Sequence, residues 1–244
     1  MLFALICFLF ACKQSNYTIK SVESSRIIMD KTRDAKANPE LVALIASYKS
    51  LMEAEMNKPI GFATQTMRKG FPQSLLSNFT ADAMLQFAER QWGGADFSVM
   101  NMGGLRATLN GGKITVGNLY EIFPFDNNLV LLELPGKAVK DFFDYVAFQG
   151  GQGVSGTVNL CIKNRKVESL TIGGKPLNLN KTYRIATIDY LAEGNDGMGV
   201  FRKATQKEES KKQLRDWMIE YVEILTADNT EVNATLDNRI TVHN

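Results

Sequence analysis

The residues with the most chemical potential lie in one short stretch, NMGGLRATLNGGKITVGNLYEIFPFDNN, residues 101–128. A Gly-Gly pair is followed at once by Arg106, and the stretch ends on Phe123-Pro124-Phe125. Glycine lets a backbone approach a ligand closely, a guanidinium forms paired hydrogen bonds, and an aromatic ring stacks. The pattern indicates either a turn-rich connection or a surface that binds one ligand.

Side chains that usually carry catalysis are scarce. The only histidine is His243, which we expect to be an exposed tail residue, and the three cysteines are Cys7, Cys12 and Cys161. The single histidine argues against zinc sites and serine triads. If the segment with Cys7 and Cys12 is removed or lipidated, Cys161 is the only thiol left, which rules out an internal disulfide. No phosphate-binding or dinucleotide fingerprint is present. A catalyst built only on carboxylates stays open, but no pair stands out, and the pattern favours a binding protein.

Composition describes an ordinary globular protein. Of the 244 residues, 45% are hydrophobic and 22% are charged, and the net charge is +2. So small a charge argues against nucleic acid as a partner. Cys161 lies in TVNLCIK, an alternating strand pattern, which predicts a buried structural thiol. The mixed-charge run KEESKKQLR, residues 207–215, predicts the start of a solvated helix.

The N-terminus, MLFALICFLFAC, is a run of twelve apolar residues. It is too short to span a bilayer, and it resembles the hydrophobic part of a secretory signal. Its end, Leu-Phe-Ala-Cys, is similar to a bacterial lipobox, which makes Cys12 the lipidated residue. Residues 1–12 are therefore predicted to be a signal and residues 13–37 a tether. The alternative is an N-terminal strand or core helix. We expect a lipid-anchored protein of the bacterial cell envelope, either periplasmic or surface-exposed.

Hydrophobic periodicity predicts a single α+β domain over residues 38–244. A helix is predicted to begin at Pro39 with Asn38 as its cap. Its apolar face comprises Leu41, Leu44, Ile45, Tyr48, Leu51 and Met52. The other predicted elements are helices at 74–90, 115–122, 139–146 and 214–225 and strands at 96–101, 128–135, 154–163, 166–172 and 182–189.

Four short motifs occur in a fixed order. They are Asn101-Met102-Gly103-Gly104-Leu105-Arg106, Phe123-Pro124-Phe125-Asp126-Asn127, Val154-Ser155-Gly156, and TIDYLAEGNDG at 187–197. Together they resemble the C-terminal, substrate-specificity domain of the 5′-nucleotidase family, which implies the fold of that domain. The resemblance runs from about residue 39 to about residue 225. Residues 38–60 are similar to the helix that joins the two domains of those enzymes.

The resemblance implies a role for each matching side chain. Phe125 and Tyr190 correspond to the aromatic pair that clamps the nucleobase, although the family usually has phenylalanine at the second position. Asp196 corresponds to the carboxylate that accepts hydrogen bonds from the ribose hydroxyls. Arg106 corresponds to an arginine that reaches toward ribose and phosphate, and Asn101 to a residue at the base edge. Each has a simpler interpretation: a core ring, a turn residue or a surface cation.

Four further positions follow from the same resemblance. Asn127 corresponds to a polar site residue, and Gly104 and Gly156 to glycines at the pocket. A further family arginine, ahead of the helix that contains Asp82, is assigned to Arg68, where the local spacing departs from the family pattern.

The family's metal chemistry resides in an N-terminal metallophosphoesterase domain, which the resemblance does not include. It therefore implies the nucleotide-binding half of a divided phosphohydrolase, with no cofactor in this chain and divalent metals in a separate metallophosphoesterase chain. Whether this chain is itself an enzyme is left open. The alternatives are a non-catalytic nucleoside- or nucleotide-binding lipoprotein for scavenging and a scaffold that has lost its ligand. Contact with a membrane is expected through the lipid alone.

Overall fold

The computed structural model describes residues 17–243, with the backbone alone for residues 34–36. It divides into two compact units after Ser47. Ahead of the division lies the 3-10 turn η1 (Lys31–Lys36), and the helix α1 (Pro39–Met56) begins there too. The Asn38 side chain accepts a hydrogen bond from the backbone N–H of Glu40 at 2.8 Å, which confirms the predicted cap. No residue of α1 is buried.

The second unit, residues 48–244, contains the remaining elements. Its helical segments are α2 (Leu75–Trp92), η2 (Met102–Gly104), α3 (Val116–Ile122), α4 (Gly136–Gln149), α5 (Asp189–Ala192), η3 (Gly199–Lys203) and α6 (Leu214–Ala227). Its strands are β1 (Pro59–Ala63), β2 (Phe97–Met100), β3 (Gly112–Thr115), β4 (Asn128–Pro135), β5 (Gly153–Val154), β6 (Val158–Lys163), β7 (Lys166–Ile172), β8 (Lys175–Pro176), β9 (Thr182–Ile188), β10 (Gln206–Gln213) and β11 (Ile240–His243). The α+β class is as predicted.

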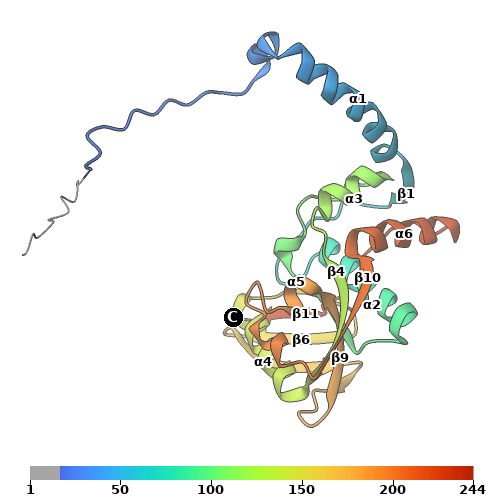
Figure 1. Cartoon of the computed structure of the whole chain (residues 1–244). Helices are drawn as coiled ribbons and strands as arrows, with labels where there is room; N and C mark the ends of the chain where they lie inside the picture. Colours follow the sequence, from blue (N-terminus) through green and yellow to red (C-terminus); the bar gives the residue numbers. More distant parts are fainter. Residues whose placement is uncertain (1–16, 244) are drawn as a thin grey trace, which may run out of the picture. The chain divides into compact units, whose positions relative to one another are not determined.

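Three sheets organise this unit. The largest has the order β10-β4-β9-β2-β5, the second β11-β6-β7-β8, and β1 pairs with β3 (Figure 1). In the largest sheet β4 is antiparallel to β9, whereas β2 is parallel to β9. The start of β4 therefore lies beside the ends of β9 and β2, at one edge of the sheet.

Helices cover the sheets and enclose the core. Helix α2 packs on β2 and β5, α4 packs on β4, β9 and β7, and α6 contacts α2 and β1. The largest fully buried side chains include Phe97, Phe142, Phe143, Phe201 and Trp217, which come from both helices and strands. None of the helices within residues 17–243 is long and apolar enough to cross a membrane.

Two helix starts follow from local side-chain chemistry. Ser74 caps α2 in a reciprocal pair with Ser77, and Thr115 does the same for α3 with Asn118. Each cap satisfies backbone N–H groups that the first turn of a helix leaves free. The α3 cap places that short helix directly ahead of the Phe-Pro-Phe stretch.

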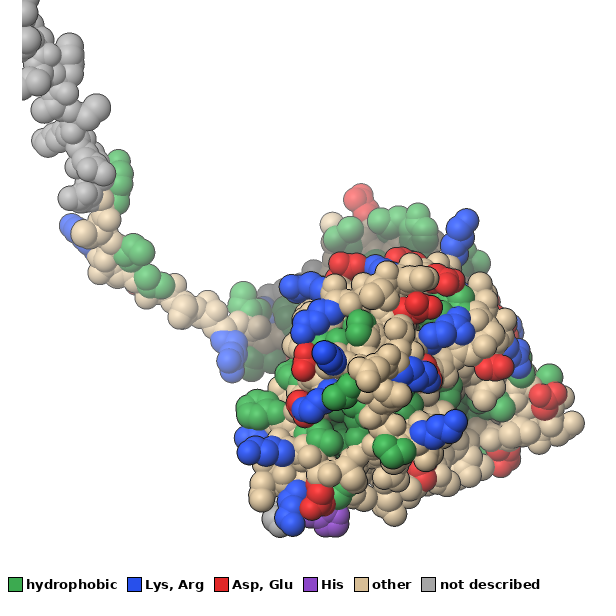
Figure 2. Space-filling model, turned by 90° about the horizontal axis from the view of Figure 1, so that it is seen from below, with side chains coloured by type: hydrophobic (Ala, Val, Ile, Leu, Met, Phe, Trp, Pro, Cys, Tyr) green, Lys and Arg blue, Asp and Glu red, His purple; other side chains and the backbone are tan. Residues whose placement is uncertain are grey.

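The structure contradicts the prediction that the mixed-charge run at 207–215 is the start of a helix. Residues Gln206–Gln213 form β10, an edge strand antiparallel to β4, and α6 begins only at Leu214. A run of charged residues is compatible with a strand at a sheet edge, where the charges also discourage pairing with another chain. On the face drawn in Figure 2, basic and acidic side chains are interspersed.

Cys161 and His243 also differ from expectation. In β6 the buried positions are Val158, Leu160 and Ile162, so the two-residue period turns Cys161 to the other face. There the half-buried thiol donates a hydrogen bond to Glu168 at 3.0 Å, and this bond raises the pKa of the thiol. His243 is exposed, as predicted, but it belongs to β11 and pairs with Lys163 of β6.

Candidate functional site

Three segments that carry the predicted site residues converge at one edge of the largest sheet. Residues 101–106 follow β2, residues 123–127 precede β4, and residues 189–197 follow β9. The parallel pairing of β2 with β9 brings their ends together, and the antiparallel pairing of β4 brings its start there. Sheet topology therefore assembles segments that are far apart in the sequence.

A cavity of about 310 Å³ opens at this edge. Its lining residues are Asn101, Gly103, Gly104, Arg106, Phe125, Asn127, Tyr190 and Asp196. The family resemblance assigns a ligand-binding role to each of these residues except Gly103. The structure therefore gathers most of the predicted site residues around one space.

Both aromatic rings of the cavity are accessible. Phe125 is 48% exposed and Tyr190 is 45% exposed. A large ring that remains outside the core keeps a face available for stacking. The interpretation of Phe125 as a core ring is therefore wrong.

Asp196 and Asn101 form the polar wall. The Nδ2 of Asn101 donates to Oδ2 of Asp196 at 2.7 Å, which leaves Oδ1 of Asp196 without a hydrogen bond among the described residues. Asn101 is only 4% exposed, and its own Oδ1 has no partner in the described part of the chain. A buried acceptor without a donor is costly. The exposed Asp196 thus offers its free carboxylate oxygen to a ligand that carries N–H or O–H groups, whereas Oδ1 of Asn101 is buried against Gly104.

The backbone around these two residues is specialised. Asp196 has φ +52 and is followed by Gly197 at φ +79. Aspartate tolerates this left-handed conformation better than most residues. A Cβ on Gly104 would clash with Cε of Met100 and lie 2.8 Å from Oδ1 of Asn101, so any side chain there would displace these neighbours.

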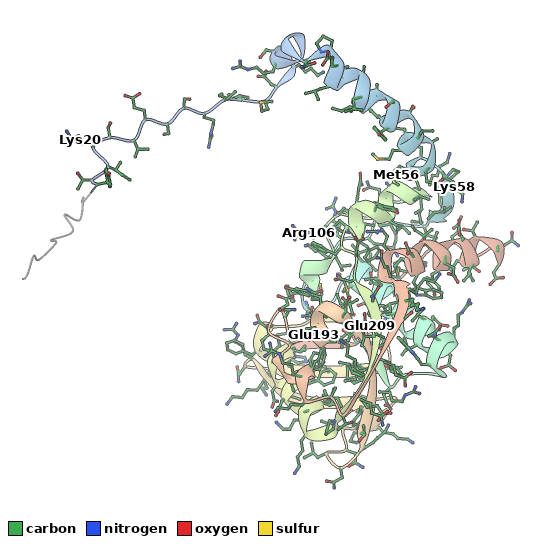
Figure 3. The ribbon with its side chains drawn as sticks, in the orientation of Figure 1. Lys20, Met56, Lys58, Arg106, Glu193 and Glu209 are labelled. Atoms are coloured by element: carbon green, nitrogen blue, oxygen red, sulfur yellow. The ribbon has the colours of Figure 1, made fainter. Side chains whose placement is uncertain are left out.

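Arg106 stands beside the Phe125 ring. Its guanidinium carbon lies 6.0 Å from the ring centroid, and its Nη1 is 3.4 Å from the carbonyl oxygen of Gly103. The side chain projects from the loop between η2 and β3, where Figure 3 labels it. It is exposed, so most of its N–H groups remain available to an anion or a hydroxyl.

Arg215 of α6 forms hydrogen bonds with the loop that carries Phe125. Its Nη1 donates to the carbonyl oxygen of Phe123 at 3.3 Å, and its Nη2 donates to Oδ1 of Asp126 at 2.7 Å. Burial lowers the pKa of Arg215, but the hydrogen bond and charge of Asp126 and other nearby groups outweigh it, so the pKa is raised. A permanently charged guanidinium thus anchors both sides of the ring-bearing residue.

Two predicted residues lie outside this cavity. Gly156 donates its N–H to Oδ1 of Asp82 at 2.8 Å, and a Cβ on it would meet Arg239, so it belongs to a different network. Arg68 is exposed and does not line the cavity. The positions of both residues depend on packing between segments that are distant in the sequence.

Lys69 is a neighbour of the site that the sequence did not single out. Its Nζ donates to the carbonyl oxygens of Met102 at 3.2 Å and Leu105 at 2.7 Å. It lines a second cavity of about 490 Å³ that shares Gly103 and Asp196 with the first. The basic pair Arg68-Lys69 is the signal in the sequence, but spacing alone does not say which of the two turns toward the site.

Cavity and fold together are those of an α+β domain with an open cavity lined by aromatic and polar side chains. The model of the family described as "5'-nucleotidase, C-terminal domain" matches residues 54–203, more than half of the chain. The chain belongs to this family.

Similar proteins agree with this assignment. UshA of Yersinia enterocolitica is 28% identical over 170 residues, which cover 68% of this chain and 31% of UshA. The trifunctional nucleotide phosphoesterase YfkN of Bacillus subtilis is 28% identical over 78% of this chain and 14% of its own length. The 5′-nucleotidase precursor of Thermus thermophilus has a TM-score of 0.72 at 26% identity, over 84% of this chain and 43% of that structure.

This chain therefore spans less than half the length of each of these proteins. Homology is to their C-terminal portion. Within residues 17–243, no group of three or more His, Cys, Asp or Glu side chains is arranged to hold a metal ion.

Proposed function

We propose that this chain binds the nucleoside part of a nucleotide. The base would stack between Phe125 and Tyr190, and the ribose hydroxyls would donate to Asp196. Asn101, which lines the cavity and holds Asp196 through its Nδ2, would lie at the base edge, and Arg106 would face the sugar and phosphate. The observation that carries the proposal is the cavity in which two accessible rings lie with the free carboxylate oxygen of Asp196.

Each contact suits its part of the ligand. Stacking of a base on an aromatic ring is worth roughly 1–3 kcal/mol and tolerates any base. The free carboxylate oxygen of Asp196 can accept from two vicinal hydroxyls. Relatives whose names specify nucleotide phosphoesterase activity support nucleotides as the ligand class.

Titration calorimetry of the purified chain with adenosine and AMP tests the proposal. Saturable binding is expected, and Phe125→Ala or Asp196→Ala should weaken it by about tenfold or more. Absence of binding at millimolar ligand by a chain that circular dichroism shows to be folded would contradict the proposal.

Phe148→Ala is the matched control for Phe125→Ala. Phe148 is also an exposed ring, 55% accessible, and the guanidinium carbon of Arg165 lies 4.7 Å from its centroid. It does not line the cavity. Its removal should leave the affinity for adenosine unchanged.

We further propose that the chain acts as the specificity half of a divided 5′-nucleotidase-type phosphohydrolase. A separate metallophosphoesterase chain would supply the divalent metals and the nucleophilic water. The purified chain should then release no phosphate from AMP by itself, and release should begin when a metal-loaded metallophosphoesterase chain is added. Robust hydrolysis of AMP by the chain alone would contradict the proposal of a divided enzyme. Binding without any effect of the second chain would identify a non-catalytic nucleoside-binding lipoprotein instead.

Attachment to the bacterial cell envelope through a lipid on Cys12 is part of the proposal. Cys12 lies outside the described residues, and the support is the sequence LFAC that precedes the polar tether. Metabolic labelling with a fatty acid should tag the chain and fail for Cys12→Ser, whereas Cys161→Ser should still be labelled. Equal labelling of the Cys12→Ser variant would remove this assignment.

A further inference from the structure

The two ring-bearing segments leave the sheet at neighbouring points. The last pair of the β4–β9 ladder joins Leu129 to Ile188. One step beyond this pair, Asn128 leads back toward Phe125, and Asp189 leads on to Tyr190. The distance between the two rings therefore depends on how the chain is held at this junction.

The carboxylate of Asp189 bridges the junction. Its Oδ2 accepts the backbone N–H of Asn128 at 3.0 Å, and its Oδ1 accepts the backbone N–H of Tyr190 at 2.6 Å. Asp189 is half-buried and begins α5. One ionised group thus satisfies a donor on each ring-bearing segment, and hydrogen bonds to a charged acceptor are short and strong.

We propose that Asp189 is a positioning residue that sets the gap between Phe125 and Tyr190. The inference rests on the proposed function and assigns to Asp189 a part in it. Arg215 already holds Phe123 and Asp126, which precede and follow Phe125 in the chain. Asp189 holds Asn128, where the same segment enters β4, and couples it to Tyr190, so the two rings act as a preformed clamp.

A preformed clamp matters because stacking has a short range. Attraction between non-bonded atoms is greatest at about 3.5–4.0 Å and falls steeply with a small additional gap. A flat base gains from both rings only if their separation is fixed before it enters, because ordering them on binding would cost conformational entropy.

Asp189→Asn tests the inference with an isosteric change. It removes the charge and replaces one acceptor oxygen with a donor that faces another N–H. We expect the affinity for adenosine to fall about tenfold. Asp141→Asn is the matched control, because Asp141 also has a hydrogen-bond partner, Lys203 at 2.9 Å, but lies on α4 outside the cavity. It should leave the affinity unchanged.

A double-mutant cycle separates positioning from a general structural role. If Asp189 acts through the rings, Asp189→Asn should cost less than about twofold once Phe125→Ala has removed one of them. If the two effects multiply in full, the inference is overturned. Asp189→Glu provides a second route if Asp189→Asn does not fold, since it keeps the charge but displaces both acceptor oxygens. Wild-type affinity of this variant would also overturn the inference.

Amide hydrogen exchange without ligand tests the bridge on its own. Exchange at Asn128 and Tyr190 should accelerate about tenfold in Asp189→Asn, while the interior of β4 and β9 stays protected. Unchanged exchange at both amides would refute the bridge, whether or not the protein binds adenosine. Accelerated exchange in a protein whose wild type binds neither adenosine nor AMP supports the bridge and refutes the nucleoside function, so the two failures are distinguishable.

Discussion

At the scale of single residues, surroundings decide which exposed ring can serve a ligand. Phe125 and Phe148 are similarly accessible, and each has an arginine near its face. Of the two, Phe125 alone shares its space with a second ring and with the free carboxylate oxygen of Asp196. Chemical type alone does not distinguish the two phenylalanines, whereas their neighbours do.

Tyr190 provides a prediction at this scale. Its hydroxyl makes no hydrogen bond among the described residues, so Tyr190→Phe should bind adenosine within about twofold of the wild type, because the ring is retained. Tyr190→Leu should weaken binding by about tenfold, the loss of one stacked contact. Calorimetry measures both. Strong loss in Tyr190→Phe would show that the hydroxyl, and not the ring, carries the interaction.

At the scale of elements, one buried guanidinium joins α2, β5 and the segment before β11. Arg239 is 5% exposed and donates to Asp82 at 2.9 Å, to Asp237 at 2.8 Å and to the carbonyl oxygen of Val154 at 2.9 Å. Gly156 is held by the same Asp82. Its place in this network explains why Gly156 does not line the cavity.

The network predicts an acid-sensitive contribution to stability. Burial raises the pKa of Asp237, but the hydrogen bonds and charge of Arg239 outweigh it, so its pKa lies below the ordinary value of 3.8. A lowered carboxyl pKa stabilises the fold above the unfolded value, and this stabilisation is lost as the pH falls through the folded value. Asp237→Asn should therefore lower the free energy of unfolding by about 1 kcal/mol at pH 7. The difference from wild type should shrink below about pH 3.8.

Urea unfolding at pH 7 and at pH 3 measures this difference. Asp141→Asn is the control, because the Asp141–Lys203 pair is exposed on both sides and should contribute little at either pH. A pH-independent effect of Asp237→Asn would show that packing, rather than charge, explains the loss.

At the scale of the whole molecule, the core belongs to residues 48–244. The buried apolar cluster begins with Ile60 and continues to Ile240, and it includes no residue of the first unit. The second unit therefore has the hydrophobic interior of an independent domain.

Deletion of residues 1–47 tests this independence. The shortened chain should melt within about 2 °C of the full chain, because it loses no core contact. It should also bind adenosine with the same affinity, since every residue that lines the cavity remains. Differential scanning calorimetry and titration measure the two quantities. A fall in Tm well beyond this range would mean that the first unit contributes to folding.

Much of the secondary structure can be predicted from the sequence alone. The helix starts at Ser74 and Thr115, the bounds of β4 and β7, and the α+β class all follow from caps and periodicity. These signals are readable because the interactions behind them join residues within a few positions of one another. The prediction of a helix start at 207–215 is wrong, because pairing with the distant strand β4 stabilises a strand there.

The family motifs in the sequence also pointed to most of the cavity, including Phe125, Tyr190 and Asp196. The folded structure was needed to show that Gly156 and Arg68 lie outside it, that Lys69 adjoins it, and that Asp189 accepts hydrogen bonds from both ring-bearing segments. Asp189 and Asn128 are 61 residues apart, and Arg215 and Asp126 are 89 apart. No local pattern encodes such contacts, because they arise when strand register and helix packing bring distant segments to one edge of a sheet.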